Sequence, residues 1–269
     1  LSTVSANLRD CSPFASLHAP GLGTAERTEW AQWFERGRDL EKSGAYPAAL
    51  EAYGKAAALD AEHAELHFRI ATCELAQGRP DPARESFTRA LDLDVLPVRA
   101  DSRINRILLD AATRDPDSRV IGIDAAETLA RRSPHGITGQ ESLYEHVHFT
   151  LEGNYRLARI LAEQIAAREP FASTAASAEE WLGREACGAR LAATLWDRHR
   201  LWRGMQGRIA AAPFTAQSSH EDNIRYCETQ RQNLIARMGP DTPEADRRLY
   251  EEALERAPDD NLLHARFAQ

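Results

Sequence analysis

Three residues in one short stretch, Glu145, His146 and His148, are of types that carry acid–base or metal chemistry. A neutral imidazole can take a proton from a hydroxyl group near pH 7, and a neighbouring carboxylate orients it and raises its basicity. The spacing of three residues lets a turn bring Glu145 to a ring nitrogen of His148, whereas His146 is expected to point elsewhere in an extended backbone. The pattern therefore predicts His148 as a general base and Glu145 as its orienting partner.

Two other interpretations of these residues stay open. His146 and His148 are two positions apart, which on a strand places them on one face, and Glu145 could then add a third metal ligand. The sequence has no other cluster of histidine or cysteine, so we predict no metal and no cofactor. The third interpretation is structural, with polar loop residues that cap the following helix and bond to the backbone.

The same stretch resembles the last conserved block of the SGNH (GDSL-type) hydrolases. That block is usually Asp-x-x-His before a helix with a glycine and an aromatic residue, here Gly153 and Tyr155, whereas this chain has Glu145 in place of the aspartate. The resemblance covers residues 1–12 and about 96–168. The order of the predicted helix INRILLDAA and strand VIGID also matches the order of elements in that family. The resemblance implies a flavodoxin-like α/β fold, serine esterase or acyl-transfer chemistry, and His148 and Glu145 as two members of a catalytic triad.

The nucleophile that this resemblance requires is missing from the sequence. The chain contains neither the family's Gly-Asp-Ser block nor its Gly-x-Asn-Asp block, and Asn7 in SANLRD is a poor substitute for the latter. We expect the serine to lie upstream of Leu1 and the chain alone to be inactive. Asn7 and Asp10 would lie just past the carboxyl end of a first strand, where ligands bind in open α/β sheets, so they and His146 are candidates for the substrate edge.

The elements that would position these residues are a helix, a strand and a second helix. Apolar spacing predicts a helix over Ser102–Arg114, and the run RVIGID predicts a buried parallel strand over Arg119–Asp124. A further helix is expected to begin after Thr150 as N-cap. This order of elements indicates an open α/β sheet, to which LSTVSANLRDC would add another strand.

An internal repeat interrupts that region. Gly78 lies 34 residues after Gly44, and the same offset relates pairs of alanines and aromatics and also Asp60 and Asp94. Thirty-four residues is the period of the tetratricopeptide repeat, two copies of which are predicted at 27–95. Small residues such as Ala49 would let paired helices approach closely, and Gly44 would take a positive φ in the turn.

A third match to the repeat occurs near the end of the sequence, where Tyr250, Ala253 and Pro258 have the family's spacing. The predicted fold is therefore mainly α, with helical hairpins inserted in, and following, the carboxyl-terminal part of an SGNH-type α/β domain. The predicted domains are the α/β part at 1–26 and 96–168, the two repeats at 27–95, a helical connector at 169–240, and the start of further repeats at 241–269.

Composition limits the partners. The net charge of −8 argues against nonspecific binding to nucleic acid, and no apolar run is long enough to span a membrane. Tetratricopeptide arrays present a groove that binds proteins or peptides, so the alternative to a hydrolase acting on acyl esters is a non-catalytic interaction scaffold.

The compartment is not predicted, because an export signal or anchor could precede Leu1. The four cysteines form no CxxC pair, and we expect mostly buried thiols.

Overall fold

The computed structural model describes residues 1–114, 120–168 and 181–268, and it divides into two compact units. Unit 1 comprises Leu1–His148 and Ala212–His220, and unit 2 comprises Phe149–Ala211 and Glu221–Gln269. Apart from isolated β-bridge positions at Ser2, Ile123, Leu143 and Phe149, the regular structure of the described residues is helical. The prediction of a mainly α chain is therefore confirmed.

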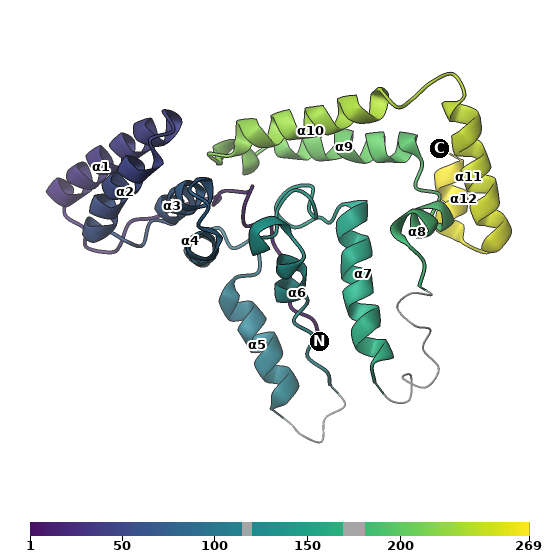
Figure 1. Cartoon of the computed structure of the whole chain (residues 1–269), viewed down its shortest axis with the longest axis horizontal. Helices are drawn as coiled ribbons and strands as arrows, with labels where there is room; N and C mark the ends of the chain where they lie inside the picture. Colours follow the sequence, from purple (N-terminus) through teal and green to yellow (C-terminus); the bar gives the residue numbers. More distant parts are fainter. Residues whose placement is uncertain (115–119, 169–180, 269) are drawn as a thin grey trace. The chain divides into compact units, whose positions relative to one another are not determined.

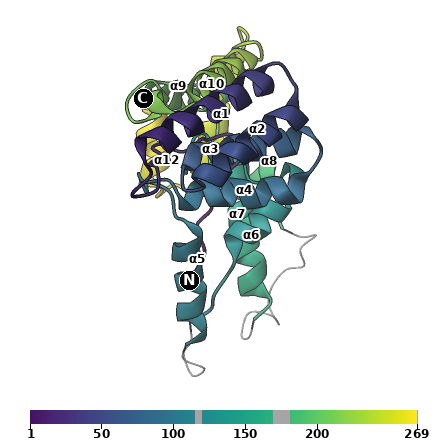
Figure 2. The same ribbon diagram turned by 90° about the vertical axis from the view of Figure 1, so that its left-hand side faces the viewer.

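Two successive helical hairpins begin unit 1 (Figures 1 and 2). Their helices are α1 (Thr24–Lys42), α2 (Tyr46–Leu59), α3 (Ala64–Ala76) and α4 (Pro80–Asp92). The turns within the hairpins contain Gly44 and Gly78, whose φ angles are +78° and +70°. These angles lie in the left-handed region, which is why the repeat requires glycine there. The helical hairpins expected from the repeat are present.

The first hairpin packs around Tyr53, whose side chain is wholly buried. Its hydroxyl group donates a hydrogen bond of 2.6 Å to Glu41, and Arg69 of the next hairpin lies 3.2 Å from the same carboxylate. Burial, and then this hydrogen bond, raise the pKa of Tyr53 far above its ordinary value. In the second hairpin Phe87 occupies the matching position and packs on Phe68.

The open α/β sheet predicted for residues 1–12 and 96–168 is not formed by the described residues, and this prediction is corrected. The predicted strands reduce to a single parallel bridge between Ser2 and Ile123, and Arg119 lies outside the described residues. One reason is visible at Val4, whose backbone N–H and C=O bind the side-chain amide of Asn105 at 2.8 and 2.9 Å. A side chain thus occupies the position where a neighbouring strand would extend a ladder.

The helix predicted at Ser102–Arg114 is present as α5 (Ser102–Thr113), capped by Asp101. It buries none of its residues, and the side chains of Ile104 and Ile107 on its apolar face stay exposed. The rest of unit 1 contains α6 (Ala125–Arg131) and the short 3-10 helices η1 (Pro134–Gly136) and η2 (Phe214–Ala216).

Unit 2 contains α7 and the α-helices that follow residue 180, apart from His220 at the start of α10. Thr150 caps α7 as predicted, since its hydroxyl oxygen accepts a hydrogen bond of 3.0 Å from the Gly153 N–H. The helices are α7 (Leu151–Ala166), α8 (Arg184–Arg190), α9 (Leu195–Ile209), α10 (His220–Ile235), α11 (Thr242–Arg256) and α12 (Asn261–Phe267). The structure describes no part of residues 169–180, which belong to the predicted connector.

The contact made by Tyr53 has a counterpart in unit 2. Tyr250 and Arg266 lie 197 residues after Tyr53 and Arg69, and they bind Asp197 as their counterparts bind Glu41. The two distances to Asp197 are 2.7 and 2.9 Å. The last two helices thus reproduce a contact of the first repeats, with the acid supplied by α9.

All four cysteines are free thiols, and Cys11, Cys73 and Cys227 are buried, in agreement with the sequence-based expectation. A search of the described residues for a long apolar helix finds no candidate membrane span.

The packing of Gly37 against Tyr53 generates the first prediction. A Cβ atom on Gly37 would lie 2.4 Å from the Tyr53 ring, so Gly37→Ala must displace a buried, hydrogen-bonded side chain. We expect it to lower the free energy of unfolding by about 1–3 kcal/mol in urea titrations. The matched control is Gly54→Ala in α2, whose Cβ would meet no atom within 4 Å and which should stabilise the helix by about 1 kcal/mol. Equal effects of the two changes would contradict the packing.

The acid stability of unit 1 is a second prediction. Burial, and then the neighbouring His18, lower the pKa of His63 from 6.5 to about 4. Because the unfolded chain binds this proton more tightly, stability is lost as pH falls from about 6.5 towards 4, by about 2 kcal/mol after allowing for solvent screening. His63→Phe keeps a ring beside Trp30 but cannot be protonated, so its free energy of unfolding should depend less on pH in this window. An unchanged pH dependence would contradict this assignment.

Candidate functional site

Glu145 is the centre of the candidate site. Its side chain is 1% exposed, and its carboxylate accepts hydrogen bonds from the backbone N–H groups of His146, Val147 and His148. The loop therefore wraps around the carboxylate, which holds a negative charge in place without a neighbouring lysine or arginine among these contacts. These bonds to the backbone are the ones expected if the loop residues have a structural role. The imidazole rings of His146 and His148 make two further contacts with the carboxylate.

Both imidazoles of the loop contact this carboxylate. The Nδ1 atom of His148 lies on Oε1 of Glu145, and the Nδ1 atom of His146 lies on Oε2. The expectation that His146 points elsewhere is therefore wrong. Its ring packs between Phe14 and Phe214, with centroid distances of 5.3 and 5.2 Å, and these contacts turn it towards Glu145.

The two histidines differ in their access to solvent. The side chain of His146 is 12% exposed, whereas that of His148 is 47% exposed. His148 is therefore accessible from solvent, and its Nδ1 contacts the carboxylate, whereas His146 lies between two aromatic rings.

The structure brings Asn7 to this loop but gives Asp10 a different environment. The backbone N–H of Asn7 donates a 3.0 Å hydrogen bond to the carbonyl of His146, and its side-chain oxygen accepts from the N–H of Asp10. The Asp10 carboxylate pairs with Arg9 and accepts from the N–H of Gln140 at 2.7 Å. In these contacts Asn7 and Asp10 stabilise the loops that position the histidines.

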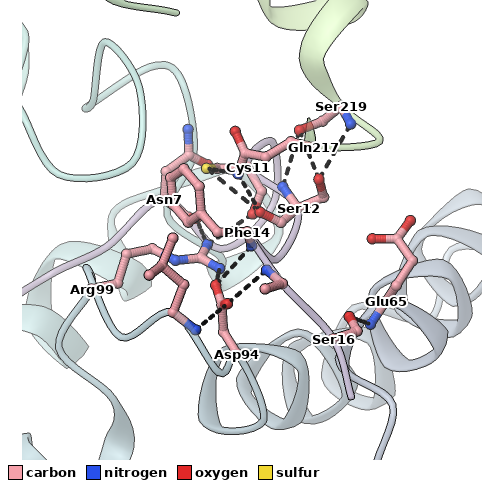
Figure 3. Close-up of polar contacts among 12 residues, drawn as sticks. Asn7, Cys11, Ser12, Phe14, Ser16, Glu65, Asp94, Arg99, Gln217 and Ser219 are labelled. Carbon is pink, nitrogen blue, oxygen red and sulfur yellow. Dashed lines mark hydrogen bonds and ion pairs between the residues drawn. The ribbon is translucent and has the colours of Figure 1, made fainter. Parts of the chain in front are cut away.

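Sequence reasoning missed Arg99, the residue that joins the site to the repeats (Figure 3). Its buried guanidinium pairs with Asp94 at 3.0 Å and donates to the carbonyls of Asn7 and Cys11 at 3.1 and 2.8 Å. It also lies over the ring of Phe14, 5.7 Å from the ring centroid. A chain of contacts therefore runs from the end of α4 through Phe14 to His146.

The segment after Asn7 is fixed from another part of unit 1. Ser12 exchanges hydrogen bonds with Ser219, at 3.0 and 3.2 Å, and its carbonyl accepts from Gln217 (Figure 3). All three side chains are buried, and Ser12 lies more than 200 residues from Gln217 and Ser219 in the sequence. No local pattern could have revealed this pairing.

Equivalent aspartates of the two repeats bind residues 12–19, which we name the strap. Asp94 accepts the N–H groups of Phe14 and Ala15 at 2.9 and 3.1 Å. Asp60 accepts the N–H of Ala19 at 3.2 Å and contacts His18 Nδ1 at 2.7 Å. The signal for this contact was present in the sequence, because Asp60 and Asp94 match in the repeat alignment.

The Arg99–Asp94 pair generates the third prediction. Arg99→Met leaves a buried carboxylate without its cation, and we expect it to lower the free energy of unfolding by about 3 kcal/mol or more in urea titrations. The control is Arg84→Met, which removes the partly exposed ion pair with Glu127 and should cost less than about 1 kcal/mol. The assigned role of Arg99 is wrong if the two variants are equally stable.

Comparison with known proteins supports the repeat. Residues 40–97 match the family model of the tetratricopeptide repeat. No curated protein and no solved structure matches the chain. The resemblance to SGNH hydrolases therefore rests on its motifs, whereas the repeat has both a family match and the corresponding helices. The matched segment, which includes α2, α3 and α4, is therefore a tetratricopeptide-repeat region.

Proposed function

We propose that unit 1 carries the acid–imidazole part of a serine-type esterase or acyl-transfer centre, with His148 as general base and Glu145 as its partner. One observation carries the proposal, namely that a buried carboxylate lies on Nδ1 of a histidine that is itself half-exposed. A carboxylate in this position fixes the neutral ring as the Nδ1–H tautomer and leaves Nε2 with a free lone pair. That is the arrangement a general base requires.

In the proposed reaction, Nε2 of His148 takes the proton of a serine hydroxyl as the serine oxygen attacks an ester carbonyl. The imidazolium ion formed is stabilised by Glu145, and it then gives the proton to the leaving alcohol as the C–O bond breaks. A second nucleophile, water or an alcohol, repeats these steps to release the acyl group. Acyl esters of carbohydrates or lipids are the candidate substrates, by resemblance to the SGNH hydrolases.

Two other features of unit 1 support this proposal. The parallel bridge between Ser2 and Ile123 pairs two extended segments separated by the repeats and α5, which is the connectivity of a β–α–β unit. The exposed apolar side chains of Ile104 and Ile121 lie on α5 and next to the bridge, where a further segment could pack. The proposal therefore places the serine in a segment additional to these 269 residues.

A second candidate function is a protein-interaction scaffold, which the family match at residues 40–97 favours. Helical repeats bind partners through extended surfaces rather than through one reactive group. In this case His148→Ala would leave partner binding unchanged. A partner captured equally by the wild-type chain and by His148→Ala, in a protein without esterase activity, would favour the scaffold.

The tautomer of His148 is the fourth prediction and can be measured on this chain. Two-bond ¹⁵N–¹H NMR correlations should show neutral His148 protonated on Nδ1, because Glu145 accepts that proton. His146→Phe keeps the aromatic packing and should leave this tautomer in place. Glu145→Gln presents both an acceptor and a donor, so the population should move towards Nε2–H. Predominantly Nε2–H His148 in the metal-free wild-type chain would rule out the base assignment.

Activity is tested on the protein encoded by the complete open reading frame. There, His148→Ala should lower ester hydrolysis by roughly three orders of magnitude or more. Glu145→Gln should cost less, and His146→Phe least. An open reading frame with no candidate serine, or near-normal turnover in a folded His148→Ala variant, would exclude the mechanism.

A further inference from the structure

The position of His146 is not explained by the proposed reaction, which needs only His148 and Glu145. Its Nδ1 nevertheless faces the same carboxylate as Nδ1 of His148. One ligand atom from each of the three residues lies within 4.8 Å of the others. Two imidazole nitrogens and a carboxylate oxygen thus lie close enough together to share one metal ion.

We propose that Glu145, His146 and His148 bind a Zn²⁺ ion, and that the ion switches off His148 as a base. The inhibitory half of this proposal rests on the proposed function, whereas the binding half does not. Three protein ligands of this kind leave a coordination position for water, as in many zinc sites. Imidazole nitrogen favours Zn²⁺ and related transition metals, whereas Mg²⁺ and Ca²⁺ prefer a full set of oxygen ligands.

The structure holds the ligands before any ion binds. Backbone N–H groups fix the Glu145 carboxylate, and the rings of Phe14 and Phe214 fix His146. The N–H of Asn7 binds the carbonyl of His146 and so fixes its backbone. Such outer contacts orient metal ligands and strengthen binding. The half-exposed His148 provides a path for the ion from solvent.

The switch follows from the two nitrogens of one ring. In the metal-free protein Nδ1 of His148 carries the proton and Nε2 carries the lone pair. When Zn²⁺ takes the lone pair of Nδ1, the Nδ1 proton leaves to solvent and Nε2 takes one from solvent, so the ring stays neutral. With its proton on Nε2, the ring has no lone pair for a serine proton.

Calorimetric titration of the chelator-treated chain with ZnCl₂ tests the binding. We expect one equivalent to bind, MgCl₂ to give no binding, and both His146→Phe and His148→Gln to weaken Zn²⁺ affinity at least tenfold. His135→Asn is the matched control, because it removes an exposed histidine of unit 1 whose positive φ asparagine tolerates, and its affinity should equal that of the wild type. No binding by the wild type, or binding unaffected by both variants, would overturn the site.

NMR separates the site from the switch and from the proposed function. Zn²⁺ should move the proton of His148 from Nδ1 to Nε2. Binding with the proton still on Nδ1 would overturn the switch. If the metal-free chain already carries the proton on Nε2, the base assignment fails instead, and the titration alone decides the metal site.

Discussion

The buried pair of Arg99 and Asp94 is the interaction on which the arrangement of unit 1 depends. Asp94 ends the second repeat, and Arg99 carries its charge to the carbonyls of Asn7 and Cys11 and to the ring of Phe14. A buried charge is costly unless it is paired and hydrogen-bonded, so neither residue can move without the other. The repeats are thereby fixed to the segment that supports His146, although the sequence gives no sign of chemistry within the repeats.

Sequence patterns predicted the features that depend on residues close together in the sequence. The offset of 34 residues predicted the helical hairpins, and the conformations of Gly44 and Gly78 follow from the shape of a tight turn. The cap at Thr150 and the helix at 102–113 were predictable because both depend on neighbours in sequence. The sheet was not, because strand pairing needs partners far along the chain, and here Asn105 occupies the edge of Val4.

The candidate site shows the same division. The spacing of Glu145 and His148 predicted their contact, since three residues suffice to close a turn. The direction of His146 could not be predicted, because Phe14 and Phe214, which set it, lie 200 residues apart in the sequence (214 − 14). Local spacing therefore identifies the residue types of a centre, whereas distant packing decides which of its side chains meet.

The strap, residues 12–19, contacts equivalent positions of successive repeats, so its own residue spacing can be compared with that of the repeat. One repeat along the array is 34 residues, and it corresponds to four residues along the strap, from Ala15 on Asp94 to Ala19 on Asp60. Four extended residues span about 13 Å, which limits the spacing between the two aspartates that the strap can bridge. Gain or loss of one repeat during evolution would therefore require the strap to lengthen or shorten by about four residues. The number of repeats in such an insert is thus linked to the length of a loop outside it.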